Sequence, residues 1–200
     1  MQSGSIVSKD ADVFIHPTAV VAEGASIGPG TRVWHFAQVR EGAVIGRECV
    51  LSKGVYIDKD VRVGDRVKVQ NGVSVYQGVT LEDEVFVGPH AVFTNDRYPR
   101  SISPVWEVTP TLVRLGASIG ANVTIVCGIT IGRFAMVGAG SVVTHDVPDH
   151  ALVVGNPARV CGIVCSCGHP LKGTGRAPRR CSECGREVAT HSSDPGEDLG

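Results

Sequence analysis

The sequence predicts an all-β fold, a parallel β-helix built from six-residue repeats. Every sixth residue from Ile15 to Phe93 is large and apolar, although only 42% of the chain is apolar. The residue four places after each of these is small or β-branched in nearly every repeat, and glycine or proline often occupies the positions between them. An α-helix has a period of 3.6 residues, and glycines would destabilise helices by about 1 kcal/mol per interior site. The patterns together exclude a helical bundle.

Each repeat is expected to form one short strand followed by one corner. The large residue and its small partner both point inward, the small one where a triangular prism narrows, and glycine allows the positive φ of a corner without steric cost. Three repeats close one turn, so residues 18 apart stack at the spacing of neighbouring strands, about 4.8 Å. We expect these coils to occupy residues 13–162.

One loop interrupts the coils. The pattern stops after Phe93 and resumes at Val113, a separation that is not a multiple of six. Residues 97–111 must therefore leave the prism, and long loops in compact repeat proteins are usually functional or disordered. Because this loop carries Pro99, Pro104 and Trp106, we expect it to form a stiff, partly apolar wall of a site, with a plain surface excursion as the alternative.

The predicted stacking also places polar residues in two columns. The column at the corner where the loop leaves contains Glu41, Lys59, Gln77 and Asn95, with Asp96 in the neighbouring column. A column at another corner contains His35, Lys53, Asn71 and Pro89, flanked by His90. In a trimer, two different corners can face each other across a groove, and we expect a site there.

Composition and charge exclude several classes of function. The net charge is −1, from 19 basic and 20 acidic residues, so there is no electrostatic case for nucleic acid or an anionic membrane as a partner. No stretch approaches the roughly 18 apolar residues of a membrane span, and residues 1–12 lack the apolar segment of a signal peptide. We therefore expect a cytoplasmic protein.

The composition changes after Val164, where four of the seven cysteines gather. An odd number of cysteines, with four crowded into a short segment, favours a metal over disulfides. Segment 163–188 resembles a zinc ribbon, because soft thiolates suit tetrahedral Zn²⁺ and each cysteine pair is followed by glycine. The expected zinc ligands are Cys165, Cys167, Cys181 and Cys184, with free thiols as the alternative. Residues 189–200 are expected to be disordered.

Several motifs within residues 13–162, about three quarters of the chain, carry a family resemblance. They are His16-Pro17-Thr18-Ala19, Val33-Trp34-His35-Phe36, and the stretches 69–76, 88–96, 138–143 and 155–159. These motifs resemble the hexapeptide-repeat acyltransferases, and more narrowly the sugar N-acetyltransferases that modify a 3-amino group on UDP- or dTDP-linked sugars. The resemblance implies a left-handed coil, an exception to the usual right-handed crossover. It also implies a homotrimer that binds acetyl-CoA between subunits.

The resemblance further implies residue roles. In that family the Asn-Asp pair after Phe-Thr, here Asn95 and Asp96, holds the amino sugar. Acetyl transfer needs a neutral amine, donors for an oxyanion and a proton acceptor. We expect Asn95 to orient the amine or donate a hydrogen bond. His90 is the candidate base, with a structural or substrate-contacting role as the alternative, in which case the departing CoA thiolate takes the proton. The other expected substrate contacts are His35, Lys59, Asn71 and Gln77. An acidic residue often stands where this chain has Gln77, so the sugar or the orientation of its amine is expected to differ.

Small residues on the late coils would let a pantetheine arm pass close to backbone amides. The expected CoA contacts are Gly116, Gly138, Ala139, Gly140 and Ser141, with Arg159 near the 3′-phosphate. This assignment rests on the resemblance, because prism geometry alone also accounts for most of these glycines.

Other functions on the same fold remain open. An O-acetyltransferase would need an essential histidine base, because a hydroxyl is a poorer nucleophile than an amine. A binding solenoid without catalysis is the alternative of a different class. A γ-class carbonic anhydrase is disfavoured: His145 and His150 have a suitable spacing, but the nearest upstream histidine, His90, lies too many coils earlier to complete a metal shell.

Overall fold

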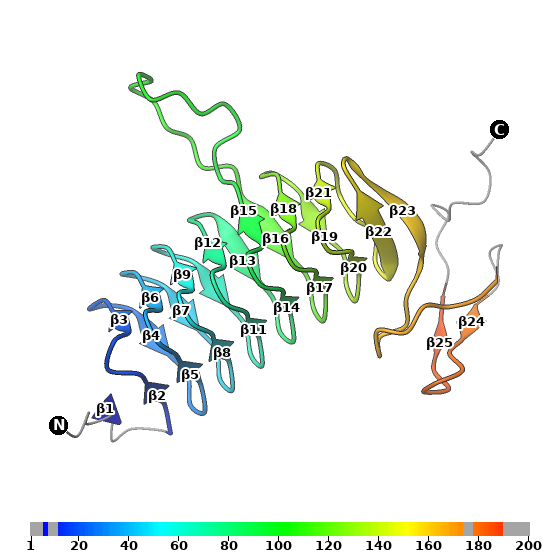
Figure 1. Cartoon of the computed structure of the whole chain (residues 1–200), viewed down its shortest axis with the longest axis horizontal. Coiled ribbons are helices and arrows are strands. Elements are labelled where there is room, and N and C mark those ends of the chain that lie inside the picture. Colours follow the sequence, from blue (N-terminus) through cyan, green and yellow to red (C-terminus); the bar gives the residue numbers. More distant parts are fainter. Residues whose placement is uncertain (1–5, 8–11, 174–177, 190–200) are drawn as a thin grey trace.

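The computed structural model describes residues 6–7, 12–173 and 178–189. Across these residues the chain forms strands and turns, with no helix and therefore none that could cross a membrane. Figure 1 shows the coils stacked along one axis, with a long loop projecting from the middle of the stack and a small module beside its C-terminal end.

Three parallel sheets form the faces of the prism. The first sheet contains β2 (Phe14–Ile15), β5 (Arg32–Val33), β8 (Val50–Leu51), β11 (Lys68–Val69), β14 (Phe86–Val87), β17 (Ser118–Ile119), β20 (Met136–Val137) and β22 (Ala151–Gly155). The second contains β3 (Val20–Val21), β6 (Gln38–Val39), β9 (Tyr56–Ile57), β12 (Ser74–Val75), β15 (Val92–Phe93), β18 (Thr124–Ile125) and β21 (Val142–Val143). The third contains β4 (Ser26–Ile27), β7 (Val44–Ile45), β10 (Arg62–Val63), β13 (Val79–Leu81), β16 (Thr111–Val113) and β19 (Thr130–Ile131).

Short antiparallel strands lie at the two ends. The first sheet is extended by β1 (Ile6–Val7) on β2 and by β23 (Ala158–Ile163) on β22. The C-terminal module contains the pair β24 (Arg179–Arg180) and β25 (Glu187–Val188).

The register confirms the predicted length of one turn. Lys68 pairs with Val50 on one side and Phe86 on the other, and both separations equal three six-residue repeats. The large residues of the six-residue pattern are buried from Val33 to Phe93, and their small partners are buried with them. One small position, Thr31, is polar, and its hydroxyl donates to the Gly46 carbonyl (2.8 Å) and accepts from the Cys49 amide (2.9 Å). A buried hydroxyl is tolerated there because both of these hydrogen bonds are made.

Three corners join the sheets, and their names are kept below. The first corner joins the first sheet to the second, the second corner joins the second sheet to the third, and the third corner joins the third sheet back to the first. The columns of the first corner include His35, Lys53, Asn71 and His90; those of the second include Glu41, Lys59, Gln77 and Asn95; those of the third include Glu48, Arg66, Glu84 and Gly116.

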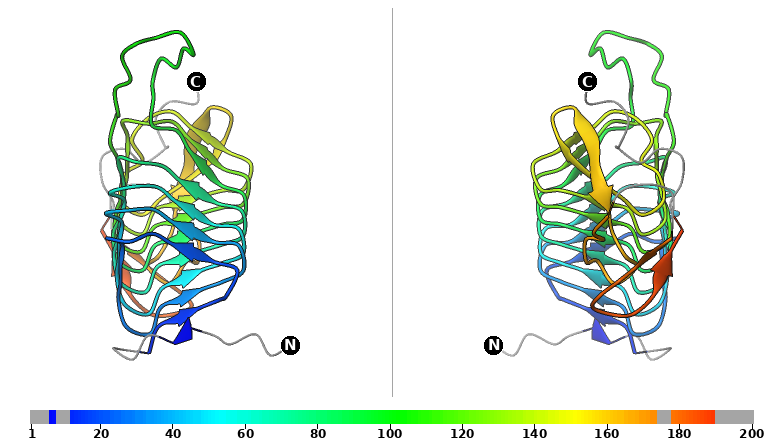
Figure 2. Two further views of the ribbon diagram at one scale, coloured as in Figure 1. Left: turned by 90° about the vertical axis from the view of Figure 1, so that its left-hand side faces the viewer. Right: turned by 90° about the vertical axis from the view of Figure 1, so that its right-hand side faces the viewer.

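The loop leaves the prism at the second corner, as predicted. Val79 pairs with Thr111 and not with Arg97, which stands one regular turn later in the sequence, so the segment between Arg97 and Thr111 lies outside the coil. Figures 1 and 2 show this segment rising well clear of the stacked coils. It ends one residue earlier than expected, because Thr111 begins β16 and is only 2% exposed. The Thr111 hydroxyl accepts from the Gly128 amide, which gives this buried polar side chain a partner inside the prism.

The C-terminal module is attached to the last coil through His150. The Val164 amide donates to the His150 carbonyl (2.8 Å), and the His150 ring Nδ1 lies 3.0 Å from the Val164 carbonyl oxygen. A separate small core holds the module together and includes Ile163, Leu171 and Val188. Of the expected disordered tail, only Ala189 is among the described residues.

Candidate active site

A hydrogen-bonded network organises the second corner beneath the loop. The Asp58 carboxylate accepts from the Tyr56 hydroxyl (3.0 Å), the Lys59 amide (2.8 Å) and the Gln77 amide (3.2 Å). Arg40 donates to the Tyr56 hydroxyl (3.2 Å) and lies 3.7 Å from Asp58. One carboxylate therefore fixes the backbone of two successive coils.

The network continues to the expected catalytic amide. The Asn95 Nδ2 group donates to the Gln77 carbonyl (3.2 Å), so these two residues share one corner as predicted. The Gln77 Nε2 group is 3.4 Å from Asp60 Oδ2, whereas Gln77 Oε1 is buried without a hydrogen-bond partner among the described residues. A buried acceptor without a donor is costly, which makes this oxygen a natural contact for a ligand N–H or O–H.

The neck of the loop is tied to the same residues. The Thr109 amide donates to the Asn95 carbonyl (2.9 Å), which closes the loop just outside the prism. Asp96 accepts from the Tyr98 amide (2.8 Å) and so shapes the first turn of the loop. Beyond the neck, Tyr98, Ile102 and Val105 are strongly exposed, so the loop presents apolar side chains at its surface. That the loop forms a wall of the site stays a prediction.

The ionisable side chains Arg40, Glu41 and Tyr56 at the second corner have shifted pKa values. Hydrogen bonds from Arg40 lower the pKa of Glu41, and hydrogen bonds to Glu41 and Tyr56 raise the pKa of Arg40. Burial raises the pKa of the Tyr56 hydroxyl, so it remains a donor to Asp58 at neutral pH. Arg40, Glu41 and Tyr56 therefore keep the same protonation state around neutral pH, and the hydrogen bonds among them are fixed.

The first corner carries the second expected column. The His35 carbonyl accepts from the Gly54 amide (2.9 Å), and the Lys53 amide donates to Asn71 Oδ1 (3.1 Å). The Asn71 carbonyl accepts from the His90 amide (2.9 Å). The His90 ring lies over Gly72, where an added Cβ would come within 2.5 Å of Nδ1.

The two columns lie at opposite ends of one face of the prism. Lys59, Gln77, Asn95 and Asp96 are at the second corner, whereas His35, Asn71 and His90 are at the first. Asn71 and Gln77 are six residues apart along an extended segment, which spans up to about 20 Å. The predicted substrate contacts are therefore not brought together within one chain.

The expected CoA residues are divided as well. Gly138, Ala139 and Gly140 form one turn at the first corner, but Gly116 is at the third corner beside Phe134. Positions 116 and 138 are not whole turns apart, so the two glycines lie at different corners. That these residues contact CoA stays a prediction. Ser141 is buried, and its hydroxyl accepts from the Gly155 amide (3.1 Å). Arg159 is exposed and lines a hollow of about 370 Å³ together with His145 and Asp146.

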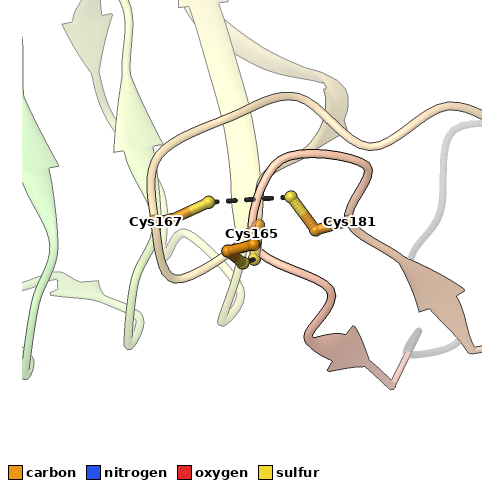
Figure 3. A group of neighbouring side chains, drawn as sticks. Cys165, Cys167 and Cys181 are labelled. Atoms are coloured by element: carbon orange, nitrogen blue, oxygen red, sulfur yellow. Dashed lines mark hydrogen bonds between the residues drawn. The ribbon is translucent and has the colours of Figure 1, made fainter.

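The four cysteines of the tail converge. Their sulfur atoms all lie within 4.8 Å of one another, with Cys165 Sγ 3.4 Å from Cys184 Sγ and Cys167 Sγ 3.6 Å from Cys181 Sγ. Figure 3 shows the Cys167 and Cys181 thiols facing each other, with Cys165 next to them. Cys165 and Cys181 are buried, and the other two are exposed. Cys165 has its pKa raised by burial, but hydrogen bonds from its neighbours outweigh this and lower the pKa to about 7.

The two histidines considered for a carbonic anhydrase are separated. His145 lies at the second corner beside Thr144, and His150 lies at the third corner, where its ring stacks on Phe134 at 5.2 Å. The spacing of the two histidines therefore does not bring them together around one metal.

Sequence reasoning missed the Arg40, Tyr56 and Asp58 network. Arg40 and Asp58 are separated by one full turn of the coil, so the stacking rule does place them in one column. Tyr56 points outward from β9 two residues before Asp58 and lies 5.9 Å from the Tyr76 ring. The network could have been found from the sequence, because Arg40 and Asp58 are residues of opposite charge one turn apart, next to the strands that lead into the site.

Comparisons with known proteins agree with this architecture. Residues 24–59 match the profile of the bacterial transferase hexapeptide (six repeats), and residues 61–77 and 116–145 match the hexapeptide repeat of succinyl-transferase. The chain is 49% identical over 165 residues to dTDP-3-amino-3,6-dideoxy-alpha-D-galactopyranose 3-N-acetyltransferase from Aneurinibacillus thermoaerophilus, covering 82% of this chain and 85% of that one. This chain belongs to the hexapeptide-repeat family of sugar N-acetyltransferases.

Two solved structures resemble this acetyltransferase. A mutant of GDP-perosamine N-acetyl transferase from Caulobacter crescentus, in complex with CoA and GDP-perosamine, aligns with a TM-score of 0.51 at 26% identity, over 76% of this chain and 57% of that one. A hexapeptide-repeat acetyltransferase from Vibrio cholerae, complexed with acetyl coenzyme A, aligns with a TM-score of 0.55 at 28% identity, over 61% of this chain and 70% of that one.

Proposed function

We propose that this acetyltransferase moves the acetyl group of acetyl-CoA to the 3-amino group of a dTDP-linked 3-amino-3,6-dideoxyhexose. The observation that carries the proposal is the contact between Asn95 and Gln77 at the neck of the loop. The bacterial relative at 49% identity acts on a sugar of this class, which supports dTDP over UDP as the nucleotide. The cytoplasm, where acetyl-CoA is made and used, is the compartment that suits this reaction.

The second corner supplies acceptors for a neutral amine. Because Asn95 Nδ2 is held by the Gln77 carbonyl, Asn95 Oδ1 is left to accept from the substrate. Gln77 Oε1 is a second acceptor without a partner among the described residues. Two acceptors that take the two N–H groups of a primary amine leave its lone pair to attack the thioester carbonyl.

In the reaction, the amine nitrogen bonds to the acetyl carbon and the carbon–sulfur bond to CoA breaks. The nitrogen must lose one proton, and the His90 imidazole or the departing thiolate takes it. His90 belongs to the first corner, up to about 20 Å from Asn95 along one chain. We therefore infer a homotrimer in which the first corner of one subunit faces the second corner of the next.

Acetyl-CoA would pass along the first corner of the late coils. Gly138, Ala139 and Gly140 lack bulky side chains and sit on the same edge as His90, two coils further along. Arg159 provides an exposed cation for the 3′-phosphate, beside the hollow that it lines. Both assignments rest on placement along the first corner, whereas Gly116, at the third corner, stays a separate prediction.

The tail cysteines fit a structural zinc site. Tetrahedral Zn²⁺ with Zn–S bonds of about 2.3 Å would hold its sulfurs about 3.8 Å apart, and the contacts of 3.4 and 3.6 Å are close to that value. Cys165, Cys167, Cys181 and Cys184 would be the ligands, leaving no open position for catalysis. Zinc would thus stabilise the module, which has only a small core of its own.

The test is acetyl transfer by the purified protein. We expect acetyl-CoA and dTDP-3-amino-3,6-dideoxygalactose to give free CoA thiol and an N-acetylated sugar nucleotide in equal amounts, measured by a thiol reagent and mass spectrometry. The matched control is the same sugar nucleotide carrying a 3-hydroxyl. Acetylation of the hydroxyl sugar at an equal rate would instead favour an O-acetyltransferase, and CoA binding without turnover would favour a binding solenoid.

A further inference from the structure

Aromatic rings gather at the N-terminal end of the first corner. The ring centroids of His16 and His35 are 3.5 Å apart in a stacked arrangement, and the His35 ring is nearly parallel to Trp34 at 6.1 Å. Phe14 packs against Trp34 at 5.2 Å. Phe, Trp and Tyr make up only 5% of the chain, so composition alone does not account for this concentration on the first two coils. We call Phe14, His16, Trp34 and His35 the aromatic ledge.

A hollow opens beside the ledge on the outer face of the first sheet. It has a volume of about 320 Å³ and is lined by Asp12, Phe14, Gly30, Arg32 and Trp34. Phe14 and Trp34 provide apolar ring faces, and the exposed Arg32 guanidinium can pair with a phosphate. Asp12 can accept hydrogen bonds from the ring N–H of a base. This combination fits a heteroaromatic ring attached to an anion.

The ledge stands in line with the expected sugar contacts. Hydrogen bonds connect the successive coils of the first corner from His35 through Lys53 and Asn71 to His90. Each coil adds about 4.8 Å, so His90 lies about 14 Å from the ledge along the axis. The exposed Lys53 stands one coil from His35, between the rings and Asn71. Along the axis the aromatic ledge comes first, then the Lys53 cation, then the Asn71 amide. A sugar nucleotide has its base, diphosphate and sugar in the same order.

We propose that the aromatic ledge and its hollow bind the base of the sugar nucleotide, with Lys53 beside the diphosphate, so that the sugar reaches Asn71 and His90. This inference rests on the proposed function and adds the site that recognises the nucleotide. Stacking on aromatic rings tolerates any base because every base has a π face, so we expect selectivity to come from the edge contact with Asp12.

Fluorescence tests the ledge directly. The chain has two tryptophans, Trp34 and Trp106, so the Trp106→Phe variant leaves Trp34 as the only indole. Titration of this variant with dTDP is expected to quench the Trp34 emission with the same Kd that calorimetry gives. Binding of dTDP without a change in Trp34 emission would overturn the proposal, and so would a failure of dTDP, UDP and GDP alike to bind the wild-type chain.

Substitutions separate the base contact from the phosphate contact. Trp34→Ala is expected to weaken dTDP binding by about tenfold or more, because stacking on an aromatic side chain is lost. Phe86→Ala, which removes a ring from the same outer face three coils away, is the matched control and should leave the Kd unchanged. Lys53→Ala is expected to weaken dTDP binding while leaving thymidine binding unchanged, with Arg62→Ala on the third sheet as its control.

The ledge could instead serve only to cover the end of the solenoid. In that case Trp34→Ala would lower the Tm, and the folded protein would bind dTDP as tightly as the wild type. That result would overturn the inference about the nucleotide site and leave the proposed acetyl transfer unaffected. Conversely, a wild-type protein that binds dTDP through Trp34 but acetylates no amino sugar would refute the proposed function and leave the nucleotide site in place.

Discussion

At the scale of single residues, Asp58 explains how the second corner is held. Its carboxylate accepts from the amide of Gln77, whose carbonyl in turn holds Asn95. Asp58 is not expected to touch the amino sugar, so it is a positioning residue. Replacing one carboxylate oxygen by an amide NH₂ puts a donor against another donor, which removes a hydrogen bond in a partly buried place.

Asp58→Asn is therefore expected to reduce kcat/KM by about tenfold, equivalent to about 1.4 kcal/mol. The control is Asp65→Asn, which removes a similar carboxylate that accepts from the Arg47 amide (3.0 Å) at the third corner, away from the site. Steady-state kinetics and thermal denaturation of both variants separate the two effects. Equal losses of kcat/KM in both would refute the positioning role.

The stacked imidazoles predict a shifted titration. Burial lowers the pKa of His16 below its usual value of 6.5, and the charge of His35 lowers it further. Because the folded pKa is the lower one, the contribution of His16 to stability is present above pH 6.5 and is lost as the pH falls through the folded pKa. NMR titration should give a His16 midpoint below 6.5 that moves upward in His35→Ala. An unchanged midpoint in that variant would mean that burial alone is responsible.

At the scale of elements, the corner glycines differ in what they make room for. Gly54 and Gly72 occupy the same position in successive coils, and both have φ of +68°. A Cβ on Gly54 meets nothing within 4 Å, whereas a Cβ on Gly72 would clash with the His90 ring at 2.5 Å. Alanine at Gly54 would therefore add backbone strain alone, whereas alanine at Gly72 would add the same strain and also displace the His90 ring.

Both Gly54→Ala and Gly72→Ala are expected to lose about 1 kcal/mol of stability, because an L-residue is strained at this φ. Only Gly72→Ala is expected to lower kcat further, through the displaced His90 ring. Denaturation midpoints and initial rates of the two variants make the comparison. Equal rates in the two variants would exclude a catalytic role for His90 and favour the CoA thiolate as the proton acceptor.

The periodic elements were predictable from sequence, and the contacts between their outward residues were less so. A period of six locates every buried apolar side chain from Val33 to Phe93, and the break in that period locates the loop. The same period places Gly116 at the third corner, apart from the other glycines expected to contact CoA. The period places Arg40 and Asp58 in one column, but the contacts that Asp58 makes with Tyr56 and Gln77 depend on side-chain rotamers and not on the period.

At the scale of the whole molecule, two units with different sources of stability are joined. The prism buries a continuous apolar core, whereas the tail module has a small core and four converging thiols. Small domains with little core usually depend on a metal or on disulfides. We therefore expect the folding of the tail module to depend on zinc and the folding of the prism to be independent of it.

We expect about one zinc per chain by elemental analysis. Cys181→Ser should reduce that content, because it removes a buried ligand, whereas Cys161→Ser, which changes an exposed thiol outside the cluster, should not. A chelator should unfold the tail module and leave the β-sheet signal of the prism in circular dichroism. Unchanged zinc content in Cys181→Ser would refute the proposed site.

We infer that the active site is shared between subunits of a trimer, because the two halves of the predicted site lie at opposite ends of one face of each chain. Mixing two inactive variants tests this most directly. One is Asn95→Ala at the second corner, and the other is the double variant Asn71→Ala with His90→Ala at the first. Random assortment into trimers would give one intact site in each mixed trimer, so mixing by unfolding and refolding together should restore about a quarter of the wild-type activity. Mixtures that remain as inactive as the separate variants would contradict a site shared between subunits.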